Sequence, residues 1–146
     1  MKIRYPVFIY AILLSIPGLL SCSQKRSRES VEEAMQTYDR LILKMDVDSI
    51  ALLYTPDGDL GKIAHGRDSI RSFLERFKNF KVLYQNSKTD LISISADTAI
   101  HAGTYRQRVI IAPGDTASVK GMFTVRWIWL TEGGWHIKRI ETQPVK

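Results

Sequence analysis

The stretch Ser118–Leu130, "SVKGMFTVRWIWL", decides the fold because its side chains alternate between the two faces of one long strand. One face carries Val119, Gly121, Phe123, Val125, Trp127 and Trp129, and the other carries Lys120, Met122, Thr124, Arg126, Ile128 and Leu130. A sheet with one solvated face alternates between apolar and polar residues, whereas here both faces are substantially apolar. The pattern therefore predicts a strand that is covered on both faces.

Two tryptophans placed two residues apart are unfavourable to leave in water. We expect one face of the strand to pack on helices and the other to meet a second subunit, which predicts a homodimer. The candidates for the dimer interface are Phe123, Val125, Trp127 and Trp129. The alternative is a long, curved strand whose cover changes along its length.

The rest of the second half also has the period of strands. Turn signals at Asn86–Asp90, Ala96-Asp97, Pro113-Gly114-Asp115 and Glu132-Gly133-Gly134 divide it into four strands.

The first half has the period of helices. Ser30 and Glu33 form a capping box, and the apolar positions of the helix that follows are Val31, Met35, Tyr38, Ile42 and Met45. Asp46 or Asp48 begins a short second helix that ends before Pro56, and a third follows Gly66. The fold class is therefore α+β, with three N-terminal helices on a curved antiparallel sheet of four or more strands.

The N-terminus is typical of a secretory signal. Lys2 and Arg4 precede an uncharged apolar run, and Pro17-Gly18 interrupts it just before the single cysteine, Cys22. Leu19, Ser21 and Cys22 resemble the lipobox of bacterial lipoproteins, which implies that Cys22 is lipidated and becomes the first residue of the mature chain. The expected domains are a signal peptide (1–21), a lipidated cysteine with a basic tether (22–30) and a folded domain (31–146).

An uncleaved membrane anchor is the competing reading, because the uncharged run is just long enough to span a bilayer. Both readings place the domain in the cell envelope, facing the periplasm, with the outer membrane favoured over the inner. The eight tether residues reach about 27 Å at most. Their basic side chains either meet anionic headgroups or only keep the tether solvated.

The net charge of +6 does not indicate nucleic acid binding. Lys2 and Arg4 lie in the expected signal peptide, and Ser23–Ser30 holds three basic residues against one acidic residue. The remaining 16 basic and 14 acidic residues give the expected domain a charge of +2, a poor match for a polyphosphate.

Four segments together resemble the nuclear-transport-factor-2-like superfamily, in its SnoaL-like and ketosteroid-isomerase-like branches. They are "MDVDSIALLYTPDG" (45–58), "HGRDSIRSFLERF" (65–77), "DTAIHAGTYR" (97–106) and "GMFTVRWIWLTEGGWHIKRIE" (121–141). The resemblance implies a cone in which a curved sheet and three helices enclose a pocket, often in a dimer formed through the outer sheet face. The superfamily includes isomerases, cyclases, dehydratases and members without chemistry, so the fold alone does not give the function.

The resemblance implies one catalytic position. The tyrosine that donates a hydrogen bond to the developing oxyanion in the isomerase branch falls on Tyr38, whereas the general-base aspartate falls on Lys62. A lysine at its usual pKa is not a general base. A core tyrosine with a satisfied hydroxyl is the competing interpretation of Tyr38.

Further pocket candidates are Tyr54, Phe73, Tyr105, Arg126 and Glu141, with a plain core as the alternative for the three aromatic residues. Arg126 matches a pocket arginine of some non-enzymatic relatives and would need an anion such as Glu141 or a ligand carboxylate. The alternative is a solvated ion pair across two strands.

The three histidines, His65, His101 and His136, have no partner at metal-ligand spacing. We therefore expect no metal site, and no cofactor motif is present. His101 is more typical of a packed or surface residue than of a base.

Three functions remain open from the sequence. The leading hypothesis is an anchored domain that binds a small, partly apolar molecule or a protein partner without chemistry. The second is an isomerase, dehydratase or cyclase that uses Tyr38. The third is an assembly module acting through the Trp127 and Trp129 face.

Overall fold

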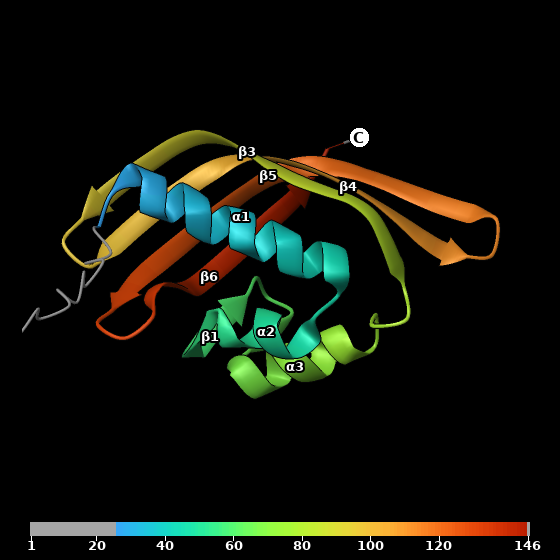
Figure 1. Cartoon of the computed structure of the whole chain (residues 1–146), viewed down its shortest axis with the longest axis horizontal. Helices are drawn as coiled ribbons and strands as arrows, with labels where there is room; N and C mark the ends of the chain where they lie inside the picture. The colour runs from blue at the N-terminus through green and yellow to red at the C-terminus, as the bar shows by residue number, and fades with distance from the viewer. Residues whose placement is uncertain (1–25, 146) are drawn as a thin grey trace, which may run out of the picture.

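The fold is a curved mixed sheet with helices in its hollow (Figure 1). The computed structural model describes residues 26–145, so Cys22 and the predicted signal peptide lie outside the described residues. The elements are α1 (Arg28–Lys44), α2 (Val47–Leu52), β1 (Tyr54–Leu60), β2 (Ala64–His65), α3 (Arg67–Glu75), β3 (Lys81–Ser95), β4 (Thr98–Ala112), β5 (Asp115–Leu130) and β6 (Gly134–Pro144).

The six strands have the order β2-β1-β6-β5-β4-β3. All neighbours are antiparallel except β1 and β6, which are parallel. Figure 1 shows α1 lying across the hollow of the sheet, with α2 and α3 packed together beside β1. The α+β cone with three helices is therefore confirmed, with one parallel pair, β1 and β6, that the sequence did not predict.

Helix α1 begins one turn earlier than the sequence predicts. Its N-cap is Ser27, whose side chain accepts from the backbone N–H of Ser30, while the Ser30 hydroxyl accepts from the backbone N–H of Ser27. The Ser30 hydroxyl also accepts a hydrogen bond of 2.9 Å from the Trp135 indole, which ties this first turn to β6. The capping box predicted at Ser30 and Glu33 is therefore wrong, and part of the predicted tether is helical.

Other boundaries follow the sequence closely. Asp46 caps α2 by accepting from the backbone N–H of Ser49, and Gly66, at a φ of 81°, precedes α3. Three of the four predicted turns separate strands. Asn86–Asp90 does not, because it lies inside β3, where the register shifts between Thr89 and Leu91. Turn-forming residues mark a bulge there, since strand pairing with β4 continues on both sides.

The inner face of β5 forms the core. Phe123, Val125 and Trp127 are buried and pack with Val31 and Met35 of α1. The expectation that these residues form a subunit interface is therefore wrong, because α1 of the same chain covers them. The alternation of β5 shows that it has two distinct faces, but it does not say which one the helices cover.

Trp129, the fourth interface candidate, is partly buried at the end of the same face. Its ring meets Trp135 edge-on at 5.2 Å between centroids, and the Arg26 guanidinium lies 5.6 Å from it. Of the two faces of β5, only the outer one is open to a second copy. Leu91 of β3, Ile100 of β4 and Met122 of β5 are exposed on this side of the sheet. The homodimer stays a prediction.

Candidate functional site

Tyr38 and Tyr54 come together at the centre of the cone. Tyr38 lies on α1, and Tyr54 is the first residue of β1 and only 1% exposed. Their hydroxyls are close enough to interact and to shift each other's pKa. A phenol hydroxyl can both donate and accept a hydrogen bond, so this pair can offer a donor to the oxygen of another molecule.

The surroundings of the two hydroxyls keep them neutral. Burial raises the pKa of Tyr38 to about 12, while the neighbouring Tyr54 hydroxyl opposes this shift. Burial also raises the pKa of Tyr54 well above its ordinary value. At any ordinary pH, Tyr38 is therefore a hydrogen-bond donor and not a base.

Tyr105 is the third member of the cluster. It lies on β4, packs against the core and is close enough to Tyr38 to raise the pKa of that residue. Its ring crosses Gly121 of the neighbouring strand β5, where a Cβ would stand 2.7 Å from Tyr105 Cε1. Glycine at this position therefore makes room for the tyrosine.

Phe73 lies on α3 and packs against the same core. Its ring is 5.1 Å from that of Phe77, which in turn is 5.6 Å from Phe80. The Arg76 guanidinium lies 4.6 Å from the Phe73 ring, a cation–π contact at the surface of this aromatic row. The structure thus places four predicted pocket residues, Tyr38, Tyr54, Phe73 and Tyr105, in one apolar cluster.

Two predicted pocket residues lie elsewhere. Arg126 and Glu141 are exposed on the outer face of β5 and β6, away from the tyrosines. Arg126 stands opposite Arg139 in the strand register, and Glu141 lies 3.7 Å from Arg139. The prediction that Arg126 and Glu141 line the pocket is therefore wrong, because strand alternation turns both side chains outward.

The position expected for a general base holds no acid. Lys62 is exposed in the turn between β1 and β2. The nearby Asp57 and Asp59 are engaged by cations, since Asp57 pairs with Lys138 at 2.5 Å and Asp59 pairs with Arg139 at 3.1 Å. His65 also bonds Asp59 at 2.7 Å.

The sequence analysis missed Asp39, which is buried next to Tyr38. One of its carboxylate oxygens accepts from the Gln85 amide and the Ser87 hydroxyl, both at 2.8 Å, and the other accepts from the Ser87 backbone N–H at 2.7 Å. These bonds join α1 to β3 without a cation. No sequence signal separated this aspartate from the solvated acids of the same helix.

His101 is fully buried, as expected for a packed histidine. Its Nε2 shares a hydrogen bond of 2.9 Å with the Thr89 hydroxyl, and its ring meets Phe123 edge-on at 5.1 Å. Its Nδ1 has no hydrogen-bond partner among the described residues. Burial lowers the pKa of His101 to about 4, so the ring is neutral at ordinary pH.

Residues 26–145 contain no group of three or more His, Cys, Asp and Glu side chains arranged to hold a metal ion. In the same residues, no helix has both the length and the apolar character needed to cross a bilayer.

Solved structures with this fold share little sequence with the chain. A ketosteroid isomerase-like protein from Erwinia carotovora atroseptica superposes with a TM-score of 0.72 at 18% identity, covering 84% of this chain and 99% of that one. A candidate scytalone dehydratase from Novosphingobium aromaticivorans superposes with a TM-score of 0.67 at 17% identity, covering 81% and 83%. A protein from Xanthomonas campestris, described as a candidate calcium/calmodulin-dependent protein kinase II association domain, reaches 0.66 at 21% identity, covering 85% and 91%.

These identities are low, so the likeness shows the fold alone. A comparison with curated protein sequences finds no match. The sequence profile of the SnoaL-like domain matches residues 24–141, which is nearly the whole described region. That family contains isomerases and dehydratases as well as members without catalysis. The chain belongs to the SnoaL-like domain family.

Proposed function

We propose that this protein is a lipid-anchored binding protein whose cone holds a small, partly apolar molecule. The observation that carries the proposal is the pair of neutral hydroxyls, those of Tyr38 and Tyr54, inside the apolar cluster of the cone. Two phenols side by side carry two protons and need only one for a bond between them, which leaves one donor, assigned here to Tyr38, for the oxygen of a ligand. A ligand with one carbonyl oxygen and an apolar body matches this donor and the aromatic residues around it.

Binding without chemistry is favoured by the state of the nearby ionisable groups. Asp39, the residue next to Tyr38, already accepts three hydrogen bonds. Asp57 and Asp59 are paired with cations, and Lys62 is exposed in a turn. A general base has to reach the proton that it removes, directly or through one water, and none of these groups is free to do so near Tyr38.

An isomerase or dehydratase is the second candidate, because the same Tyr38 proton could stabilise an oxyanion. The two functions differ in turnover. A cyclic enone that is bound but returned unchanged, with no exchange of its α-protons in D2O, supports binding alone. Exchange of those protons that disappears in Tyr38→Phe would instead support the enzyme.

The binding test uses 2-acetonaphthone, which has an apolar body and one carbonyl, and 2-ethylnaphthalene, which lacks the carbonyl. We expect 2-acetonaphthone to raise the Tm of the protein and to bind about 2–10-fold more weakly to Tyr38→Phe, which loses one hydrogen bond. The affinity for 2-ethylnaphthalene should stay the same in both proteins. If neither compound binds, the proposal for the cone is contradicted.

The anchor is proposed at Cys22, outside the described residues. Three residues separate Cys22 from Arg26, and the four steps along the chain span about 14 Å when extended. Lipidation would therefore hold the start of α1 close to the membrane, which we place at the periplasmic face of the outer membrane. Mass spectrometry of the membrane-extracted protein should show a chain that begins with an acylated Cys22. An intact Met1 or a free thiol would contradict the anchor.

A further inference from the structure

An open groove of about 940 Å³ lies on strands β3, β4 and β5 beside the end of β6. Its lining includes three cations, Arg106, Arg108 and Lys120, together with Tyr84, Ser118 and Val145. No aspartate or glutamate lines it. This volume lies at the upper end of the range of small-molecule sites.

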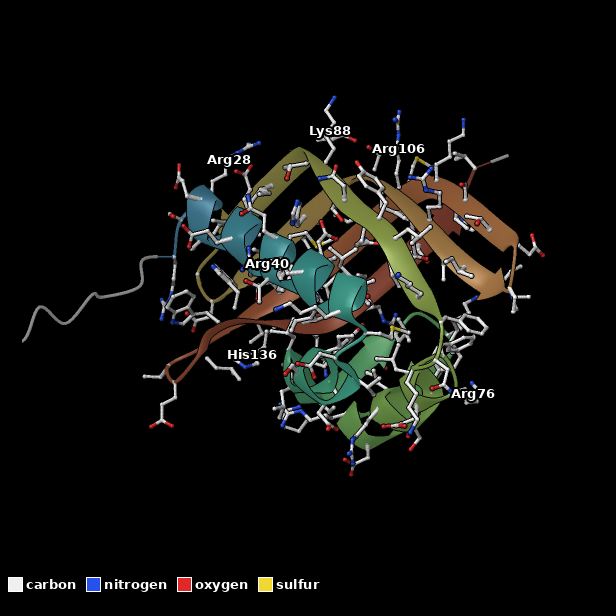
Figure 2. The ribbon with its side chains drawn as sticks, turned by 45° about the vertical axis from the view of Figure 1, so that its right-hand side comes forward. Arg28, Arg40, Arg76, Lys88, Arg106 and His136 are labelled. Atoms are coloured by element: carbon white, nitrogen blue, oxygen red, sulfur yellow. The ribbon has the colours of Figure 1, made fainter. Side chains whose placement is uncertain are left out.

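The strand register gathers the cations on one face. Arg106 stands directly opposite Lys120, and Arg108 stands between Tyr84 and Ser118 in the next row of the sheet. Residues directly opposite each other point to the same side of a sheet. Figure 2 shows Arg106 projecting outward from the ribbon, in the same direction as Lys88. The groove is therefore on the outside of the sheet, whereas Tyr38 is on the inside.

The facing pair of Arg106 and Lys120 is unfavourable in the free protein, because like charges directly opposite each other destabilise a sheet. Within residues 26–145, neither of them nor Arg108 forms an ion pair. A group of unpaired cations around a groove indicates that an anion completes it.

A second pair of facing cations, which also involves β5, shows the contrast. Arg126 stands opposite Arg139 on β5 and β6, but Arg139 lies 3.1 Å from Asp59 and 3.7 Å from Glu141. The chain thus supplies carboxylates to one pair of facing arginines. Among residues 26–145, it supplies none to Arg106 and Lys120.

We propose that this groove binds a soluble small molecule with an anionic head and an apolar or aromatic body. The head is a phosphate or a carboxylate, held by Arg106, Arg108 and Lys120, since guanidinium groups match both anions. The body lies along Tyr84 and Val145, which are 45% and 44% exposed. Neither the cone ligand nor the lipid anchor is needed for this site.

Other occupants fit these observations less well. A second copy of the chain docked here by two-fold symmetry would bring a second set of the same cations to the interface. An anionic membrane presents a broad surface, whereas the cations line a hollow. The groove therefore favours a discrete molecule over either of them.

The probe is phenyl phosphate, with neutral phenyl β-glucoside as the matched control ligand. The protein is the chain from residue 22 onward with Cys22→Ser, which retains every described residue. We expect calorimetry to show binding of phenyl phosphate that weakens as salt rises, because the contacts are ionic. Phenyl β-glucoside should not bind.

The variants Arg106→Gln and Lys120→Gln should each weaken the binding of phenyl phosphate at least tenfold. Each should also raise the Tm of the free protein, because the facing like charges are removed. Arg126→Gln, on the same strand as Lys120 but outside the groove, should leave the Kd within twofold. If these cations had a purely structural role, replacing them would not raise the stability of the protein while lowering its affinity for phenyl phosphate. Should either groove variant fail to fold, Arg108→Gln tests the loss of affinity without an expected gain in Tm, because Arg108 stands opposite Tyr84 and Ser118 and not a like charge.

The proposal is overturned if phenyl phosphate does not bind, or if Lys120→Gln binds it as the unsubstituted protein does. It is also overturned if the protein binds phosphatidylglycerol vesicles but not phenyl phosphate, which would assign the cations to a membrane. Self-association that Lys120→Gln abolishes, without phenyl phosphate binding, would assign them to a second copy.

Discussion

The two faces of β5 carry different chemistry on alternate residues of one strand. Phe123, Val125 and Trp127 point inward and are at most 3% exposed, whereas Lys120 and Met122 point outward. Inside, the polar groups are neutral or hydrogen-bonded, as Tyr38 and Asp39 are. Outside, charged groups meet water. The comparison teaches that one strand of this sheet can serve a buried apolar site and an exposed ionic site at once.

The largest effect expected from this comparison is on stability. Trp127→Ala should lower the free energy of unfolding by about 3–5 kcal/mol, because the indole is fully buried and its loss leaves a cavity. Met122→Ala, on the outer face of the same strand, should change it by less than about 1 kcal/mol. Urea denaturation measures both. Similar losses for the two variants would show that the outer face is also packed.

The second effect is on the buried hydrogen bonds between α1 and β3. Asp39→Ala should lower the free energy of unfolding by about 3 kcal/mol, because the Gln85 and Ser87 donors lose their acceptor. Asp48→Ala removes an exposed ion pair with Arg71 and should lower it by less than about 1 kcal/mol. If denaturant unfolding showed equal losses of free energy of unfolding for the two variants, Asp39 would act only as a surface charge.

The third effect tests how closely the strands approach. A Cβ at Gly103 would stand 2.1 Å from the Lys88 carbonyl oxygen and 2.8 Å from Phe123 Cζ, so Gly103→Ala should destabilise the fold by about 1–3 kcal/mol. Thr104→Ala, at the exposed neighbouring position, should change the stability by less than about 0.5 kcal/mol. Thermal unfolding distinguishes them, and a stable Gly103→Ala variant would contradict the close approach.

The smallest effect depends on pH. Burial lowers the pKa of His101 from 6.5 to about 4, so between these values the unfolded chain binds a proton that the folded chain does not. Stability should therefore fall as the pH drops from 6.5 to 4, by about 2 kcal/mol between pH 7 and pH 5, and level off below pH 4 as far as this group is concerned. His101→Leu should lose this part of the profile. An unchanged profile in that variant would assign the acid sensitivity to other groups.

Much of the fold could be predicted from periodicity and end signals, because these reflect local geometry. Asp46 and Gly66 marked helix starts correctly, and three of the predicted turns, at Ala96-Asp97, Pro113-Gly114-Asp115 and Glu132-Gly133-Gly134, separated the strands. The start of α1 was missed because Ser27 and Ser30 both suit an N-cap, and contact with Trp135 is not visible in the sequence.

The site was predicted in part for a similar reason. Tyr38, Tyr54, Phe73 and Tyr105 were found because inward positions follow the helix and strand periods. The faces of Phe123 and Arg126 were interchanged, since alternation separates two faces without saying which one the helices cover. The pairing of Arg106 with Lys120 depends on strand register, which the sequence alone did not give.

The central claim is that the two faces hold two separate sites, one for a neutral ligand and one for an anion. The most direct test titrates 2-acetonaphthone and phenyl phosphate into three proteins: the unsubstituted chain, Tyr38→Phe and Lys120→Gln. We predict that Tyr38→Phe weakens only the binding of 2-acetonaphthone and that Lys120→Gln weakens only the binding of phenyl phosphate. If either variant weakens both ligands alike, or if neither variant weakens any, the claim of two separate sites is contradicted.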